Sequence, residues 1–506
     1  MQPSDRLPRP HAFVRPVQIA AVPGPSTPLL DGVLAGVSRA LTARGGRWTE
    51  TPDDDTDACV TAARLHDRLP WRRSPLFTGR KRYGLTRKPA CYAFVHVPEA
   101  QLAELLERLG VALAKERAAP ADFDFPGLSP NAWQVLRDQG RRGGAMMSLG
   151  RLLQAQAKSL RVVMVVGDAR PAAAHLFDLA GAFPRIDARD PARFHDELAL
   201  RIATHLSTRE VTNHRADDAP IPAALWRRSE GPAAMLRVSR ELGARRFFTS
   251  MVRIADLVDV PAITDAVAKQ YSEGCFGTFD PTIGAQLVTV TGSDHPVEKA
   301  SLGEDDLAVI DGVLDDGRGV RVRAVEGLRN DPPSSEAVEF ELIDRHLPRV
   351  RLGRDFAVAA EVPVVRSKLH GHRGVLAYDP ASVEYVPLDE PFYHYLVSCS
   401  TDAQAKGVTA AFARAEALRD PADPRTVVFT VLPGHGLLMA EKWVPGTRPF
   451  DVLLRAMDEG RLEIGHGVPQ GAMGYERRGA RMVLRRDDGA VPVPAADLGR
   501  YGLSAG

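Results

Sequence analysis

The chain has 506 residues, more than one hydrophobic core can organise, so we expect roughly two to four domains. Hydrophobic residues make up 44% and charged residues 25% of the chain, a globular composition that argues against extended disorder. There are 65 Lys and Arg against 64 Asp and Glu, and this net charge of +1 excludes a global attraction to nucleic acid or membranes.

The N-terminal part of the chain predicts an α/β domain over residues 1–158. Residues 17–22, VQIAAV, have the pattern of a short buried strand, and residues 29–44 follow at helical spacing. A second apolar strand, residues 91–97, precedes an amphipathic helix at residues 99–116. The turn after the first strand has neither the dinucleotide nor the Walker-type glycine pattern, so the sequence indicates neither kind of phosphate site there.

A second α/β domain is expected over residues 159–300. It opens with residues 161–168, RVVMVVGD, a fully apolar strand pattern. The Ala-rich residues 172–182 predict a helix, and further helices are expected within residues 196–207 and 232–258. Alternation of strands and helices is typical of parallel sheets, so we expect a parallel-type sheet in each of the two domains.

The remaining residues, 301–506, predict a β-rich C-terminal domain. Residues 306–327 contain two alternating runs joined by LDDGRG, which favours a β-hairpin. Further short strands follow, with a helix expected at residues 401–419. The predicted fold class is therefore α/β, with two N-terminal α/β domains and a β-rich C-terminal domain.

The four cysteines, Cys59, Cys91, Cys275 and Cys399, are far apart in the sequence and form no CxxC pair. This spacing argues against a zinc ribbon, an iron–sulfur cluster or a disulfide scaffold. The N-terminus lacks the apolar core of a signal peptide, and no apolar run reaches the length of a membrane span. We therefore expect a cytoplasmic, reduced protein.

Two carboxylates and one imidazole form the first candidate site. Glu273, Glu298 and His435 each lie in a Gly- or Pro-containing turn beside an apolar segment. Together they would leave open coordination positions on a divalent cation, and their oxygen-rich chemistry suits Mn²⁺ or Mg²⁺. The alternative is that Glu273 caps a turn, Glu298 pairs with a neighbouring base and His435 is a core histidine.

A second candidate lies in RSKLHGHRG. His370 and His372 would point to the same face of a strand, and Arg373 adds a positive charge, so the three residues are expected to hold substrate oxygens. A basic surface loop explains the same residues equally well. A third candidate, a nucleophile pair of His394 and Cys399, is disfavoured because Cys399 lies in an apolar, uncharged run.

The order of these features resembles the L-fucose/L-arabinose isomerase-like family. In that family two α/β domains precede a β-rich domain, and the ligands are an acid beside a cysteine, a second acid, and a late histidine in a turn. YSEGC at Glu273, HPVEK at Glu298 and LPGHG at His435 carry the resemblance, over roughly residues 160–460. Here the first acid precedes the cysteine, the second acid is Glu where the family has Asp, and the turn holds one histidine where the family has two.

The resemblance implies an Mn²⁺-dependent aldose–ketose isomerase in which Glu273 and Glu298 bind the metal and move the proton. We thus expect a homo-oligomeric enzyme that uses Mn²⁺ or another divalent cation on a small sugar-like or polyol substrate, with neither nucleic acid nor a membrane as partner. The alternative is a non-catalytic binding or assembly protein. Its basic segments, residues 71–88 and HGHRG, would contact an anionic partner.

Overall fold

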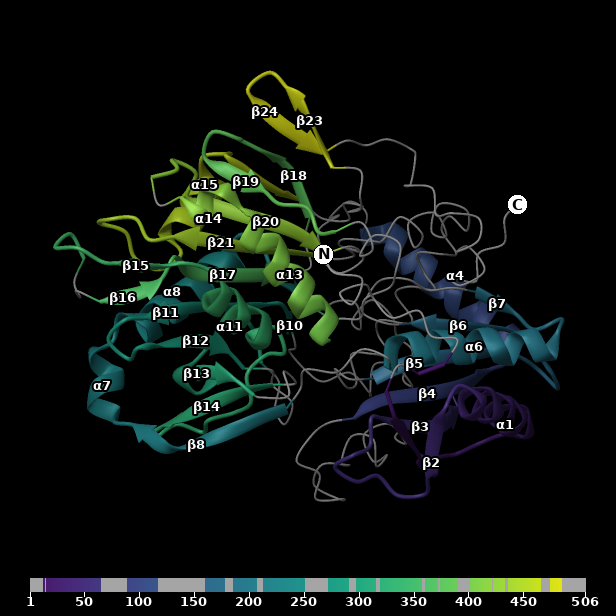
Figure 1. Cartoon of the computed structure of the whole chain (residues 1–506). Coiled ribbons are helices and arrows are strands. Elements are labelled where there is room, and N and C mark those ends of the chain that lie inside the picture. The colour runs from purple at the N-terminus through teal and green to yellow at the C-terminus, as the bar shows by residue number, and fades with distance from the viewer. Residues whose placement is uncertain are drawn as a thin grey trace.

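The structure is a computed structural model. It describes residues 12–13, 15–64, 89–116, 160–177, 185–206, 213–250, 272–290, 297–314, 319–356, 360–371, 374–389, 401–420, 422–432, 436–465 and 474–484. These residues form two large sheets with helices packed on them, and each sheet has its own hydrophobic core (Figure 1). The α/β fold class predicted from the sequence is confirmed.

The N-terminal sheet has seven strands, and its first five run parallel to one another. In spatial order the strands are β2 (Gly46–Thr49), β1 (Val17–Ala21), β3 (Ala58–Arg64), β4 (Ala90–Val97), β5 (Leu160–Gly167), β6 (Pro171–Phe177) and β7 (Arg185–Asp187). Helices α1 (Pro28–Ala43) and α6 (Pro191–Leu206) bury their apolar sides in the core of this sheet, and α4 (Glu99–Glu116) packs against β5. The apolar strand patterns of the sequence thus become the buried parallel strands.

The helix predicted at residues 172–182 is wrong, because strand β6 occupies the first part of that segment. Alanine favours helices, but β6 is paired with β5 on one side and with β7 on the other. Ala174, for example, lies opposite Val165 of β5 and Ile186 of β7. Tertiary pairing therefore overrides the local helix propensity.

The second large sheet has nine strands and is mostly antiparallel. In spatial order the strands are β19 (Val383–Tyr385), β20 (Val427–Leu432), β21 (Gly436–Lys442), β17 (Val365–Gly371), β11 (Cys275–Asp280), β12 (Ala285–Thr289), β13 (Leu307–Val313), β14 (Gly319–Val325) and β8 (Asn213–Ile221). Only the outermost pairs, β19 with β20 and β8 with β14, are parallel among these described strands. The β-hairpin predicted around LDDGRG is confirmed as β13 and β14.

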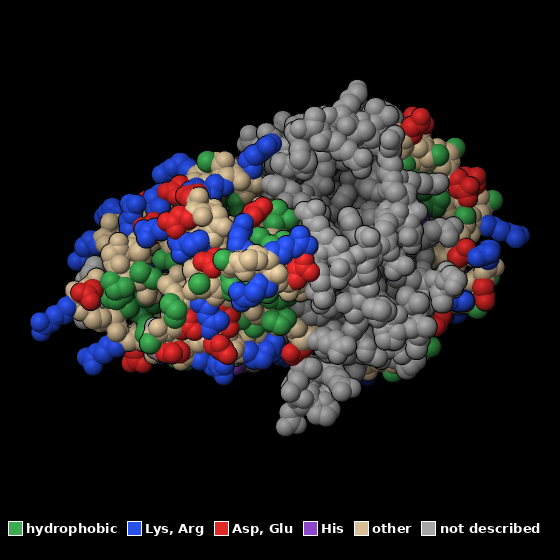
Figure 2. All heavy atoms as spheres, turned by 90° about the horizontal axis from the view of Figure 1, so that it is seen from above, with side chains coloured by type: hydrophobic (Ala, Val, Ile, Leu, Met, Phe, Trp, Pro, Cys, Tyr) green, Lys and Arg blue, Asp and Glu red, His purple; other side chains and the backbone are tan. Residues whose placement is uncertain are grey.

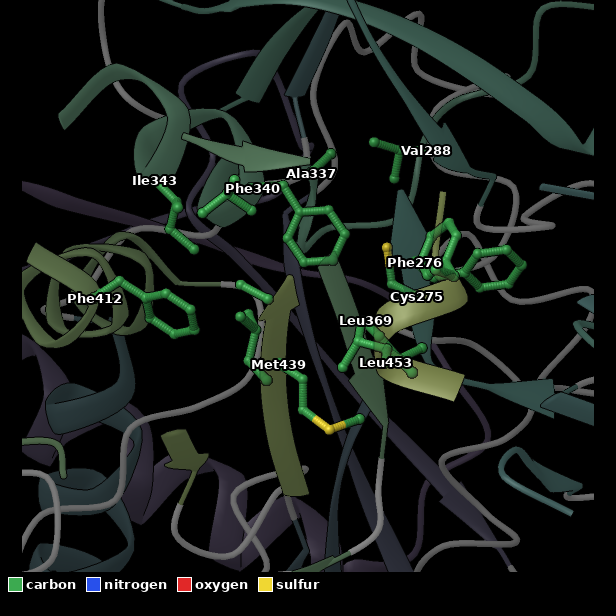
Figure 3. Packing of buried hydrophobic residues seen from close by; sticks show 14 of the residues in the cluster. Cys275, Phe276, Val288, Ala337, Phe340, Ile343, Leu369, Phe412, Met439 and Leu453 are labelled. Atoms are coloured by element: carbon green, nitrogen blue, oxygen red, sulfur yellow. The ribbon is translucent and has the colours of Figure 1, made fainter. Parts of the chain in front are cut away.

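Helices cover both faces of the nine-stranded sheet. Helix α11 (Ala337–His346) lies so close to β11 that a Cβ atom on Gly277 would be 3.3 Å from the Phe340 ring. Helix α8 (Glu230–Ala244) lies on the opposite face, where Gly231 N donates to Asp280 Oδ2 at 2.8 Å. Figure 3 shows Ala337, Phe340 and Ile343 of α11 gathered above the strands.

Two more helices complete these layers: α13 (Asp402–Arg414) packs beside α11, and α15 (Asp451–Asp458) packs against β21. A four-stranded sheet consists of β22 (Leu462–Gly465), β18 (Gly374–Tyr378), β24 (Arg481–Leu484) and β23 (Tyr475–Arg478). The short remaining elements are α7 (Ala223–Arg228), β9 (Thr249–Ser250), β10 (Ser272–Glu273), the 3-10 helix η3 (Glu304–Asp306), β15 (Arg349–Arg351), β16 (Glu361–Pro363) and α14 (Glu416–Arg419). Among the described helices, none combines the length and apolar character needed to cross a lipid bilayer.

Strand pairing crosses both of the predicted domain boundaries. The boundary after residue 158 separates β4 from β5, yet the two strands are parallel neighbours in one sheet. The boundary after residue 300 separates β12 from β13, which are antiparallel neighbours in the other sheet. The described residues instead divide into a core built from residues 17–206 and a core built from residues 221–462.

Candidate functional site

Three adjacent strands of the nine-stranded sheet meet at one end, where β11 begins. Cys275, the first residue of β11, lies opposite His370 near the end of β17. On the other side of β17, Gly371 lies opposite Leu437, the second residue of β21. Because the three strands alternate in direction, the start of β11, the end of β17 and the start of β21 lie side by side. We call this edge the β11 end of the sheet.

Described residues that adjoin the predicted site positions in the chain lie at this β11 end. Glu273 precedes Cys275 by two residues, and its backbone in β10 pairs with Thr249 of β9. His372 and Arg373 follow Gly371 directly in the chain, and His435 directly precedes Gly436. The side chain of Glu273 and the residues His372, Arg373 and His435 lie outside the described part of the structure.

Two aromatic rings pack on the backbone of this sheet end. The Phe248 ring is stacked on Phe276, and a Cβ atom on Gly274 would lie 3.1 Å from it. Gly274 has a φ of +115°, a conformation that a residue with a side chain rarely adopts. The Phe247 ring occupies the space that a Cβ atom on Gly371 would need. Glycines at these two positions therefore allow the rings to approach the ends of β11 and β17.

Lys299 is the centre of a buried polar cluster near the end of β12. Its Nζ atom donates to the carbonyl oxygen of Val290 and to Ser334 Oγ, the latter at 3.3 Å. Ser334 Oγ in turn donates to Val290 O at 3.2 Å, and Ser334 N donates to Thr289 O at 2.9 Å. These bonds tie the segment that leads into α11 to the end of β12.

The Lys299–Ser334 contact is not arranged as a nucleophile and its base. The ammonium group donates to the hydroxyl oxygen, and the hydroxyl proton points to a backbone carbonyl. A general base would have to accept that proton. Burial lowers the pKa of Lys299, while the neighbouring acidic groups oppose this effect. The contact thus holds the two segments together.

Glu298 lies next to Lys299 but in a different environment. It is half-buried, and its Oε1 atom accepts a hydrogen bond from Ala300 N at 3.1 Å. Its backbone oxygen accepts a second bond, from Ser301 N at 3.0 Å. Glu298 thus caps a short turn, whereas the structural alternative considered for it was pairing with a neighbouring base.

His370 lies on a strand, as predicted, but its ring is fully buried. Its Nδ1 atom is 2.9 Å from the carbonyl oxygen of Leu437, the residue that begins the neighbouring β21 pairing. A ring held in this way positions the start of β21. The prediction that His370 itself contacts substrate oxygens is therefore not supported by its surroundings.

Cys275 is buried at the start of β11, beside Phe276 (Figure 3). Burial, with a contribution from the negative charge of Glu336, raises the pKa of the Cys275 thiol to about 12. The thiolate, which is the reactive form, is therefore scarce near neutral pH. Cys275 is a core residue rather than a nucleophile.

Two glutamates at the start of α11, Glu336 and Glu339, were not predicted as site residues. Glu339 is buried, and its Oε1 atom accepts a hydrogen bond from the amide of Gln404 on α13. Its Oε2 atom accepts no hydrogen bond from any residue that the structure describes. Burial, and then the charge of Glu336, raises the pKa of Glu339 to about 8. Near neutral pH, Glu339 is thus largely a neutral carboxylic acid.

The sequence did contain a signal for these glutamates. Glu336 and Glu339 are three residues apart, so they lie on the same side of a helix. That side also carries the apolar residues Phe340 and Ile343, both fully buried. Carboxylates on the apolar face of a helix indicate either a buried network or a functional site.

Other predicted features lie partly outside the described residues. No group of three His, Cys, Asp or Glu among the described residues is placed to hold a metal ion. His394, Cys399 and the basic residues 71–88 are not described. On the face shown in Figure 2, the described Lys and Arg side chains are interspersed with Asp and Glu, so this part of the surface has no patch of a single sign.

No protein-family model, no curated protein and no solved structure matches this chain.

Proposed function

We propose that the chain is an enzyme that moves a proton between adjacent carbons of a small sugar-like or polyol substrate, as in aldose–ketose isomerisation. One observation carries the proposal: the strand register at the β11 end gathers the chain positions next to Glu273, His372, Arg373 and His435. These residues come from three segments of the chain, separated by about 100 and about 60 residues. A shared sheet end where such segments meet is a common place for a ligand site.

The acid–base chemistry of a buried glutamate on α11 supports the same proposal. An isomerase needs a group that takes a proton from one carbon and returns it to the next, and such a group works best with a pKa near the working pH. Glu339 has a pKa raised to about 8, and its Oε2 atom makes no hydrogen bond with a described residue. A carboxyl group in this state holds a proton near neutral pH and can release it.

In this proposal Glu273, Glu298 and His435 would hold a divalent cation such as Mn²⁺. Carboxylate and imidazole donors suit that ion, and when bound it would polarise a carbonyl oxygen of the substrate. His372 and Arg373 would bind substrate oxygens, and the buried His370 would keep β21 in place beside them. Glu298 would have to release its bond to Ala300 N, or bind through its Oε2 atom.

Metal content and isomerase activity test the proposal together. Elemental analysis would compare wild type with a Glu273→Gln/His435→Ala variant and with a control, Glu197→Gln/His346→Ala, whose residues lie on α6 and α11 away from this end. We expect about one equivalent of metal and ketose formation from a panel of aldoses in wild type and control, with both lost in the first variant. Wild type that binds no Mn²⁺ and converts no aldose would refute the proposal.

A further inference from the structure

Two of the four cysteines, which are far apart in the sequence, are direct neighbours in the N-terminal sheet. Cys59 on β3 and Cys91 on β4 lie opposite each other in the parallel register. Ala58 and Val60 face the core formed with α1 and α6, so alternation places Cys59 on the other face of the sheet. Ala90 and Tyr92 also belong to that core, which places Cys91 on the same face as Cys59.

The two thiols are also close to each other. Cys59 and Cys91 are register partners on the same face of adjacent strands, and Cys91 Sγ donates to Pro89 O at 3.5 Å. Paired residues on adjacent strands have Cα atoms about 5 Å apart, within the range of roughly 4.4–6.8 Å that a disulfide spans. A bond between the two sulfurs therefore needs a change of side-chain torsions and no movement of the strands.

We propose that Cys59 and Cys91 form a dithiol that peroxides oxidise to a disulfide linking β3 to β4. One thiolate attacks an oxygen of hydrogen peroxide, which breaks the O–O bond and leaves a sulfenic acid and hydroxide. The sulfur of the other cysteine attacks the sulfenic sulfur, the S–S bond forms, and the S–O bond breaks. In sum, two thiols lose two electrons and two protons, and one peroxide becomes two waters.

Burial of the pair governs how this reaction runs. Cys59 and Cys91 are only 3% and 2% exposed, so small oxidants are favoured over bulky thiol reagents. The neighbouring Cys91 thiol, and then burial, raises the pKa of Cys59, so the thiolate is scarce and the first step is slow. The second step is fast by comparison, because the resolving cysteine is the register partner on the adjacent strand. This inference does not depend on the proposed function.

Thiol counting on the full chain tests the inference. Reduced protein would be treated with hydrogen peroxide, quenched with catalase, denatured, labelled with N-ethylmaleimide and weighed by intact mass spectrometry. The chain has four cysteines, so untreated protein takes four labels, and we expect treated protein to take two. Peptide mapping should recover Cys59 linked to Cys91.

Two variants act as matched controls. Cys59→Ser should take three labels both before and after peroxide, whereas Cys275→Ala should fall from three to one. Four labels on treated wild type, a linkage that involves Cys275 or Cys399, or sulfinic acid at Cys59 in place of the linkage would each overturn the inference. Because the mapping is done on wild type, the result stands even if a variant folds poorly.

Discussion

Replacing Lys368 should lower the free energy of unfolding, because it leaves a buried carboxylate without its cation. Lys368 on β17 is fully buried, and its Nζ atom lies 2.5 Å from Asp344 Oδ1 on α11. In Lys368→Met, Asp344 loses its cation while remaining in the core. An isolated charge there is so unfavourable that the carboxyl group would fold in its protonated form. Burial already raises the pKa of Asp344 in the wild type, with Lys368 opposing that rise.

The size of the stability loss in this variant depends on the pH. The carboxyl group has an ordinary pKa of 3.8, so holding it protonated at pH 7 costs at most about 4 kcal/mol, at about 1.4 kcal/mol per pH unit. Because the variant's native state then binds one proton more than its unfolded state, its stability falls relative to wild type as the pH rises. We expect Lys368→Met to lose about 3 kcal/mol at pH 7 and less than about 1 kcal/mol near pH 4.5.

Urea unfolding at pH 4.5, 6 and 7 measures this directly. The control is Lys406→Met, since Lys406 is 75% exposed and pairs with Asp402 at 3.2 Å on the surface of α13; it should change stability by less than about 0.5 kcal/mol. The double replacement Lys368→Met/Asp344→Leu should recover most of the loss. A penalty for Lys368→Met that does not change with pH would refute the reasoning.

Two further predictions concern buried glutamates. The native state keeps a proton on Glu339 between pH 4.5 and about 8 that the unfolded chain has lost, so wild-type stability falls as the pH rises through that window. The glutamine in Glu339→Gln cannot ionise and keeps an acceptor for Gln404, so this variant should gain stability relative to wild type as the pH rises to about 8. If urea unfolding shows the same dependence of stability on pH for the variant and for wild type, the prediction is contradicted. Glu441 on β21 accepts bonds from Ser367 Oγ, Phe450 N and Leu453 N at 2.7, 2.5 and 3.0 Å and so anchors the start of α15. Glu441→Gln should cost about 1–3 kcal/mol in the same assay, whereas the surface variant Glu463→Gln should be neutral.

Local sequence patterns predicted individual elements better than their grouping. Strands β1, β4 and β5 form because each is an apolar run, and the pairing of β13 with β14 agrees with the hairpin predicted from the Asp-Gly sequence. Strand pairing crosses the predicted domain boundaries, because that pairing joins distant segments. No local feature of β5 indicates that it adds to β4 across more than sixty intervening residues.

The candidate site shows the same limit. The sequence pointed to the residues around Glu273 and Glu298, and the register explains why Cys275 and His370 belong to the same sheet end. The sequence did not predict the hydrogen bond from Lys299 to Ser334, because that contact depends on how α11 docks on β12. Likewise, the Cys59–Cys91 pair exists only once β3 and β4 have aligned.

The order of the strands along the chain determines the order in which they emerge from the ribosome during synthesis. Every residue of the first core precedes Asn213, so that core can close before the second sheet exists. Strand β8 then emerges first among the nine strands, yet its partner β14 follows about 100 residues later. At roughly 5–20 residues per second, β8 waits about 5–20 seconds with an unpaired edge. Nascent chains stalled between these two strands are therefore the ones most exposed to aggregation and most in need of chaperone protection.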